Sequence, residues 1–257
     1  MTELHLHRWV LDGRAVLAFA KAQRLLGHRG DVDHGYIAHA ALQAVFGEAS
    51  PKPFVAEDDL TPAAPGRADL PLLAYSPQAH DALRERARRE HLPLVQWERS
   101  SSKPVPPIEA GSELGFTAKT SPTVRTRSAA PGHEGSGRDH AREVDAFLAA
   151  CFRAGEGVAV DRAAVYRDWL ARELGGPTGR AATLGDFSLV GFQRTRLLRK
   201  QATDGAQGRV RHLVERPSAL VTGTLRVGDA EAFRALLARG LGRHRAFGFG
   251  MLLLRRA

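Results

Sequence analysis

The chain has 257 residues, of which 43% are hydrophobic and 25% charged. It is long enough for one large domain or two small ones, and its composition excludes a disordered or fibrous chain. Lys and Arg number 37 against 28 Asp and Glu, a net charge of +9. This balance favours a polyanionic partner, with nucleic acid first, although a GC-rich genome that favours Arg would have the same effect.

The sequence gives no sign of a membrane or a secretory route. It opens without a signal-peptide pattern, and apolar runs such as 146–152 are far shorter than the roughly 20 residues of a bilayer span. Cys151 is the only cysteine, so an intrachain disulfide and a cysteine zinc site are excluded. We therefore expect a cytoplasmic protein without membrane partners.

The first half of the chain alternates between strand and helix patterns. Apolar periodicity, caps and turn residues predict strands at 4–11, 52–55, 70–75 and 114–119, and helices at 14–25, 33–46 and 78–90. This βαββαβ order is the ferredoxin-like motif, an α+β arrangement.

The second half has a weaker version of the same order. Residues 120–138 are rich in Ser, Thr, Pro, Gly and Arg, as linkers are. We expect domains at 1–125 and 139–257 with a linker at 126–138. Beyond the linker, the patterns predict helices at 139–152, 162–174 and 229–239, a β-rich stretch at 186–227 with a hairpin loop at 204–208, and a last strand at 249–254.

Tyr36 and His39 share one face of the helix predicted at 33–46. Helical geometry places Ala38, Ala41, Leu42 and Val45 on the opposite, apolar side. Residues three apart on a helix are neighbours, and imidazole is suited to proton transfer near neutral pH. A catalytic pair is one interpretation, and an ordinary surface helix is the other.

The segment 240–250 contains four glycines and the cations Arg243, His244 and Arg245. It follows a helix and leads into a strand, which excludes the dinucleotide and P-loop arrangements. Gly240 alone could serve as a helix cap, but Gly242 and the later glycines then stay unexplained. Free backbone amides beside cations suit phosphates, so we predict RNA contact here.

The predicted hairpin is strongly basic. Because side chains alternate along a strand, its basic residues fall in pairs on the same strand face. A two-stranded ribbon of this kind could follow a phosphate backbone. The alternative is an ordinary solvent-exposed surface. The predicted RNA-binding residues here are Arg194, Arg196, Arg199, Lys200, Arg209 and Arg211.

No ligand spacing points to a metal or cofactor. His5 and His7 share a strand face and residues 57–59 are acidic, but no H-E-x-x-H or comparable motif joins them. The serine motif G-x-S-x-G is also missing. We therefore predict neither metal nor cofactor.

Three features occur in one order: residues 36–46, the basic hairpin, and the glycines of 240–250. Together they resemble the CasE family of the RAMP superfamily, the endoribonucleases that process precursor CRISPR RNA in type I-E systems. Residues 114–122, 166–170 and 221–227 are also similar. The resemblance spans nearly the whole chain and is most specific toward the C-terminus.

The resemblance implies tandem ferredoxin-like (RRM-like) domains and metal-independent cleavage at the base of a CRISPR repeat stem-loop. The ribose 2′-OH would attack the adjacent phosphate and leave a 2′,3′-cyclic phosphate. His39 matches the catalytic histidine, Tyr36 the assisting tyrosine, and Arg199 and Lys200 the basic residues near the scissile phosphate. The family further implies assembly into a type I-E Cascade surveillance complex. Ala40, where some members have a polar or basic residue, leaves open a weakly active member.

The rival hypothesis is a non-catalytic RNA-binding or structural subunit of a ribonucleoprotein. Such modules read single strands through aromatic side chains on a sheet. Aromatic residues make up only 7% of this chain, so the endoribonuclease ranks first.

Overall fold

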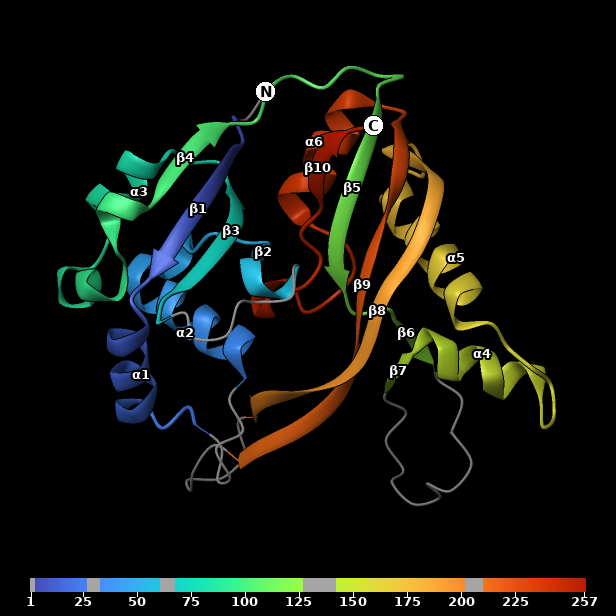
Figure 1. Ribbon diagram of the computed structural model, residues 1–257, viewed down its shortest axis with the longest axis horizontal. Helices are drawn as coiled ribbons and strands as arrows, with labels where there is room; N and C mark the ends of the chain where they lie inside the picture. The colour runs from blue at the N-terminus through green and yellow to red at the C-terminus, as the bar shows by residue number, and fades with distance from the viewer. Residues whose placement is uncertain (1–2, 27–32, 61–67, 127–141, 202–209) are drawn as a thin grey trace.

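The computed structural model describes residues 3–26, 33–60, 68–126, 142–201 and 210–257, without the side chains of Arg142, 197–201 and 210–213. Figure 1 shows two halves side by side, each built on one sheet. The helices and strands are β1 (His5–Leu11), α1 (Gly13–Ala22), α2 (His34–Phe46), β2 (Phe54–Ala56), β3 (Leu70–Ser76), α3 (His80–Arg86), β4 (Ser101–Pro104), β5 (Glu113–Thr120), β6 (Thr123–Thr126), β7 (Arg142–Asp145), α4 (Ala146–Ala154), α5 (Arg162–Gly175), β8 (Ala182–Gln201), β9 (Val210–Val227), α6 (Ala230–Arg239) and β10 (Leu253–Arg256).

The first sheet has the strand order β2-β3-β1-β4, and every neighbouring pair is antiparallel. The chain reaches it as strand, helices, two strands, helix and strand, and the last strand lies beside the first. This is the ferredoxin-like arrangement expected from the βαββαβ pattern. Alternation along β1 sends Trp9 and Leu11 into the core under α1 and α2, while Leu4 just before it joins the core of the second half.

The second sheet has the order β10-β5-β9-β8, again antiparallel throughout. Counted within its own half, this order is the same as in the first sheet, with the last strand beside the first. The helices α5 and α6 take the places of the two crossover helices. The predicted α+β class, a tandem pair of ferredoxin-like motifs, is confirmed.

One strand was predicted in the wrong half. We expected β5 to close the first motif, but it pairs with β9 from Glu113↔Arg226 to Thr120↔Ala219 and opens the second. The closing strand of the first sheet is instead β4, a short, mostly exposed edge strand whose residues do not alternate. Division of the chain into domains at 126–138 stays a prediction, because strand pairing alone does not define folding units.

Three local predictions were also wrong. Residues 123–126, expected in an irregular stretch, form β6 and pair with β7 at 142–145, where we expected the start of a helix. That helix, α4, begins only at Ala146 because Asp145 caps it by accepting from the Phe147 amide at 2.8 Å. The last strand begins at Leu253 and not at 249.

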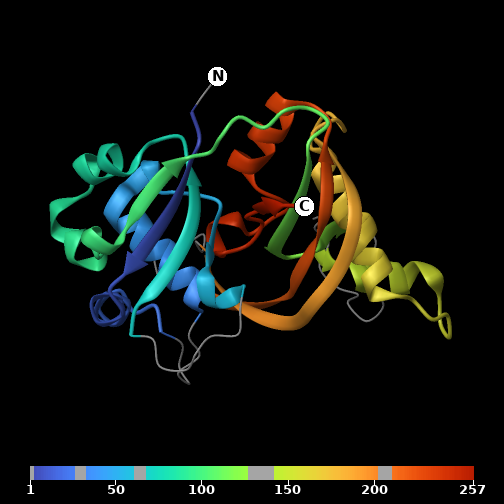
Figure 2. The ribbon, with the colours of Figure 1, turned by 45° about the horizontal axis from the view of Figure 1, so that its top comes forward.

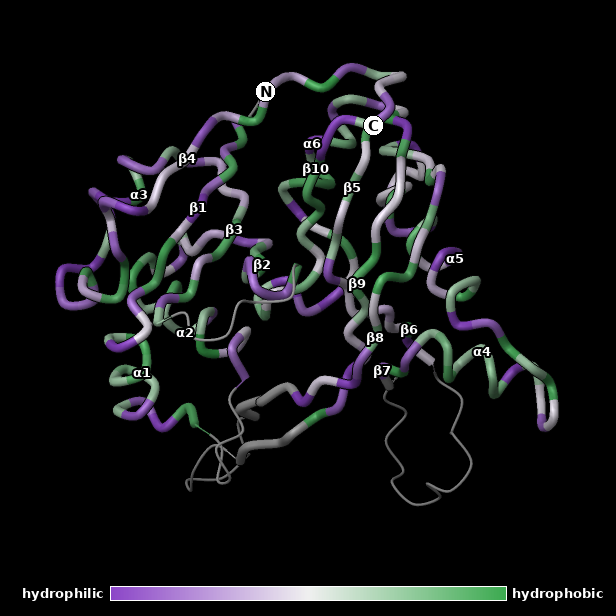
Figure 3. The backbone as a smooth tube through the Cα atoms, in the orientation of Figure 1, coloured by the Kyte–Doolittle hydropathy of each residue, from purple (hydrophilic) through white to green (hydrophobic). Residues whose placement is uncertain are grey.

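The predicted hairpin is confirmed by the pairing of β8 with β9, which runs from Ala182↔Val227 to Gln201↔Val210. Figures 1 and 2 show that it curves away from the second sheet toward the side of α2. Figure 3 shows hydrophobic positions where β8 and β9 cross the second half and hydrophilic positions farther along the hairpin. The predicted loop at 204–208 lies outside the described residues.

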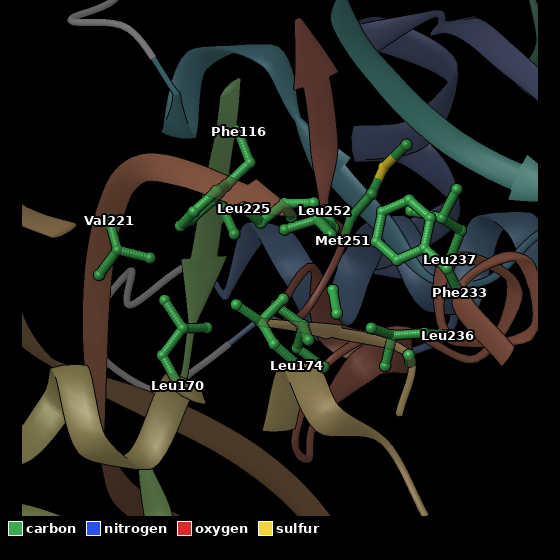
Figure 4. Close-up of a cluster of buried hydrophobic side chains, with 14 of the residues drawn as sticks. Phe116, Leu170, Leu174, Val221, Leu225, Phe233, Leu236, Leu237, Met251 and Leu252 are labelled. Carbon is green, nitrogen blue, oxygen red and sulfur yellow. The ribbon is translucent and has the colours of Figure 1, made fainter. Parts of the chain in front are cut away.

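The main core contains residues of both halves, and Figure 4 labels those of the second half. Phe116 of β5 and Leu225 of β9 lie with Leu174 of α5 and Phe233 of α6, all fully buried. Each such side chain contributes about 1.5 to 3 kcal/mol when buried. Tyr75 of β3 belongs to the same core, and its hydroxyl donates to the Leu252 carbonyl oxygen at 3.0 Å. The two sheets are therefore held together by packing and by a buried hydrogen bond.

Within the described part of the chain, no helix combines the length and apolarity that a membrane span requires.

Candidate functional site

The helix α2 places Tyr36 and His39 as predicted. Asp33 caps it by accepting from the Tyr36 amide at 2.9 Å. Ala38 and Leu42 are buried on the inner side, whereas Tyr36 and His39 are half-buried on the outer side. The two side chains therefore share one accessible face.

That face meets the 3₁₀ turn η5 (Arg245–Phe247) of the glycine-rich segment. Tyr36 stacks on the Phe247 ring, with centroids 6.0 Å apart and planes 17° apart, and His39 meets the same ring edge-on at 5.2 Å. The approach is so close that a Cβ added at Gly35 would collide with the Phe247 carbonyl oxygen. Glycine at position 35 therefore lets the first half pack against the C-terminal segment.

The pKa of His39 is lower than that of an unperturbed histidine. Burial lowers its pKa below the usual value of 6.5, and the nearby charge of Lys52 lowers it further. Lys52 is exposed and lies just before β2. In the RNA-free protein the imidazole is therefore mainly neutral at pH 7.

The four glycines of 240–250 all have positive φ, between 60° and 83°. We expected the backbone amides of this segment to be free donors, but two of the glycine amides are bonded within the protein. The Gly240 amide donates to the Leu236 carbonyl oxygen at 2.7 Å, and the Gly242 amide donates to the Glu173 carboxylate at 2.9 Å. Since the protein itself occupies these two donors, the expectation that every amide of the segment is free was wrong, and RNA contact by Gly240 and Gly242 stays a prediction.

The three cations of the segment differ in surroundings. Arg243 Nε and His244 Nε2 lie 3.5 and 3.4 Å from the two carboxylate oxygens of Glu143. Arg245 donates to the Arg239 carbonyl oxygen at 2.7 Å. Of the three, Arg243 alone is exposed and His244 is buried. Arg243 is thus the cation best placed for an outside ligand.

A cavity of about 760 Å³ opens beside this segment. It is lined by Lys52, Glu143, Arg239 and residues 242–247, among others. Phe247 lines it and also touches the rings of Tyr36 and His39. Tyr36 and His39 do not line the cavity themselves, so Phe247 is the contact between the catalytic candidates and the cavity.

On the hairpin, Arg194 and Arg196 lie on one face of β8 as predicted. Both reach Glu215 of β9, at 3.9 and 3.5 Å, and both keep about 60% of their side-chain surface exposed. Arg199, Lys200 and Arg211 are strand residues whose side chains lie outside the described part, and Arg209 lies outside it altogether.

Sequence reasoning missed two charged residues of this site. Lys52 acts on His39 within the first half, and Glu143 contacts Arg216 and His244 within the second. These contacts form only when each half folds, so local sequence patterns do not reveal them. Asp59 contributes elsewhere, since it pairs with Lys119 at 2.7 Å. Among the described residues, no cluster of three or more His, Cys, Asp or Glu side chains could hold a metal ion.

Comparisons with known proteins agree with this architecture. The chain is 21% identical to a CRISPR endoribonuclease Cse3 bound to a 19-nucleotide RNA, covering 98% of this chain and 99% of that one, with a TM-score of 0.58. It is 17% identical to Cas6e from Escherichia coli K-12, covering 98% and 100%, with a TM-score of 0.53. A chain of a pre-nicking CRISPR RNA-guided surveillance complex is 15% identical, covering 98% and 100%, with a TM-score of 0.51.

At these identities the structural likeness establishes the fold. No curated protein matches the chain. A sequence model of the family described as CRISPR associated protein, however, matches residues 4–256. The chain therefore belongs to the CRISPR-associated protein family.

Proposed function

We propose that this protein is an endoribonuclease that cuts CRISPR precursor RNA at the base of the repeat stem-loop without a metal ion. One observation carries the proposal: Tyr36 and His39 converge on Phe247 at the edge of a cavity lined by cations. Similar structures include a CRISPR endoribonuclease bound to RNA, which supports the choice of substrate.

The proposed reaction is an internal displacement at one phosphate. The ribose 2′-oxygen forms a bond to phosphorus while the bond to the 5′-oxygen breaks, leaving a 2′,3′-cyclic phosphate and a 5′-hydroxyl. One proton leaves the 2′-hydroxyl and one reaches the 5′-oxygen. His39 carries one of these transfers, since imidazole titrates near neutrality, and Tyr36 assists from the same helix face.

The direction of transfer follows from the protonation of His39. Burial and Lys52 lower its pKa, which favours the neutral form that accepts the 2′-hydroxyl proton. A bound phosphate has the opposite effect, because its negative charge stabilises the imidazolium that would protonate the 5′-oxygen. The pH dependence of the rate distinguishes the two roles.

The surrounding cations would bind RNA and stabilise charge. Lys52 and Arg243 line the cavity and can offset the charge that develops on the phosphate oxygens. Arg194 and Arg196 on the hairpin would contact the stem backbone, together with Arg199, Lys200, Arg209 and Arg211. A chain of similar fold occurs in a CRISPR RNA-guided surveillance complex, which supports the proposal that the product is retained in such an assembly.

The proposal is tested with a CRISPR repeat hairpin RNA incubated with the protein in EDTA. We expect one cut, with a product that mass spectrometry identifies as a 2′,3′-cyclic phosphate. The same RNA with a 2′-deoxyribose at the cut position should bind but stay intact. RNA that is bound and never cut would favour the non-catalytic subunit, and a product with a 3′-hydroxyl would contradict the 2′-OH mechanism.

A further inference from the structure

Glu143 of β7 lies at the centre of a cluster of basic side chains beside the cavity. Arg216 donates to its carboxylate at 3.1 Å, and Arg243 Nε and His244 Nε2 lie 3.5 and 3.4 Å from it. The Thr123 hydroxyl donates to the same carboxylate at 3.3 Å. One carboxylate from β7 therefore contacts both β9 and the glycine-rich segment.

This cluster is mostly buried. The exposed fraction of the side chain is 10% for Glu143, 13% for Arg216 and 2% for His244. Burial alone would raise the pKa of Glu143, but the adjacent His244, Arg216 and Arg243 lower it to about 2. The carboxylate is thus an anion at neutral pH, and its removal would leave the mostly buried charge of Arg216 with less compensation.

His244 connects this cluster to the catalytic candidates. It has φ of 61°, a left-handed conformation uncommon in non-glycine residues, and its carbonyl oxygen accepts from the Phe247 amide at 2.8 Å. Its ring also lies 6.4 Å from that of Phe247, which contacts Tyr36 and His39. His244 therefore contacts Phe247 through both its carbonyl oxygen and its ring.

We propose that Glu143 is a positioning residue for RNA cleavage. Its pairing with His244 fixes residues 244–247, and through Phe247 it fixes the orientation of His39 and Tyr36. Its contact with Arg243 orients a guanidinium whose side chain remains 42% exposed, so that a phosphate can bind the outer side. This inference rests on the proposed function for its catalytic consequence.

The first test is Glu143→Gln, which keeps the shape of the side chain and removes its charge. We expect the single-turnover rate at saturating repeat RNA to fall by about 10-fold or more, while the Kd changes by less than about 3-fold. The matched control is Glu57→Gln, which removes the same charge from an ion pair with Arg8 and should leave the rate and the Kd unchanged. An unchanged rate in Glu143→Gln would overturn the proposal.

A double-mutant cycle tests the path through Phe247. If Glu143 acts by positioning residues 244–247, the loss in Glu143→Gln/Phe247→Leu is smaller than the product of the two single losses. Independent, multiplicative losses would contradict that path. Should Glu143→Gln fail to fold by circular dichroism, His244→Asn breaks the same pair with a residue that tolerates positive φ, and the same fall in rate is expected.

A measurement without RNA separates this inference from the proposed function. The imidazole NMR signals of His39 should shift in Glu143→Gln and stay in place in Glu57→Gln. If the wild-type protein cuts no repeat RNA, the proposed function fails, yet a shifted His39 signal still supports the positioning role. If the protein cuts RNA and neither signal nor rate responds to Glu143→Gln, the positioning role alone fails.

Discussion

The His39 imidazole meets the Phe247 ring edge-on, with centroids 5.2 Å apart, although the two residues belong to opposite halves of the chain. Tyr36 stacks on the same ring. The helix α2 is anchored in the core of the first half, and η5 belongs to the C-terminal segment. The candidate site therefore exists only when both halves are folded and packed together.

Tyr36→Phe should lower the cleavage rate by about 10²-fold, the usual scale for a group that assists proton transfer. The ring would still stack on Phe247, so the melting temperature should change little. Tyr75→Phe is the matched control, because it removes a buried hydroxyl that donates to Leu252 and costs about 1 kcal/mol of stability. Full activity in Tyr36→Phe would exclude a role for the phenol.

Lys52→Gln should raise the pKa of His39, because the neighbouring cation that disfavours the imidazolium is removed. NMR titration of the imidazole checks this shift, with Lys21→Gln on α1 as the control. The limb of the pH–rate profile that follows His39 should move to higher pH. A limb that rises with pH identifies His39 as the base, and one that falls identifies it as the acid.

If the pKa of His39 is the same in Lys52→Gln and in the wild-type protein, Lys52 does not act on His39. Its proposed effect on the phosphate beside His39 would then also be contradicted.

Arg194→Ala with Arg196→Ala should weaken RNA binding and make it less dependent on salt. Each phosphate contact contributes about 0.7 to 0.9 to the slope of log K against log salt, so the slope should decrease by about 1.4 to 1.8. Their exposed ion pairs with Glu215 are worth little and should not prevent binding. The control, Arg84→Ala with Arg86→Ala on α3, removes the same charge, and an equal loss there would argue against a specific role for the hairpin.

His7 should make the fold less stable in acid. Burial, with the charges of His5 and His80 and against the hydrogen bond to Gln78, lowers its pKa from 6.5 to about 4. Between these values the unfolded chain takes up a proton that the folded protein does not, so stability falls as the pH decreases. The free energy of unfolding should fall by about 2 kcal/mol from pH 7 to pH 5.

Urea unfolding at the two pH values measures this difference. His7→Gln should remove most of it, while His34→Gln, at an exposed position of α2, should not. An equal difference in the His7 variant would assign the pH dependence to other groups.

Local sequence patterns were sufficient to predict helices and strands that bury one face and expose the other. The spacing of Ala38, Ala41 and Leu42 correctly predicted which side of α2 is buried, and hence the shared face of Tyr36 and His39. The strand β4 was missed because Ser101–Pro104 is polar and becomes a strand only by pairing with β1. Its omission moved β5 into the wrong half.

Long-range contacts of the site could not be predicted in the same way. Lys52 affects His39 only because the loop before β2 folds back on α2, and Glu143 reaches His244 through the β6–β7 ribbon. Glycine is required at positions 240 and 242 by positive φ and by close packing against Pro53 and Trp169, and both amides donate hydrogen bonds within the protein. The sequence alone does not distinguish such structural glycines from the glycines of a loop whose amides are free to bind a ligand.

The most direct test of the central claim is the single-turnover cleavage of repeat RNA by His39→Ala in EDTA, with His34→Ala on the same helix as control. We expect a loss of about 10²-fold or more in His39→Ala, with RNA binding retained and the control fully active. Cleavage at the wild-type rate in His39→Ala would contradict it.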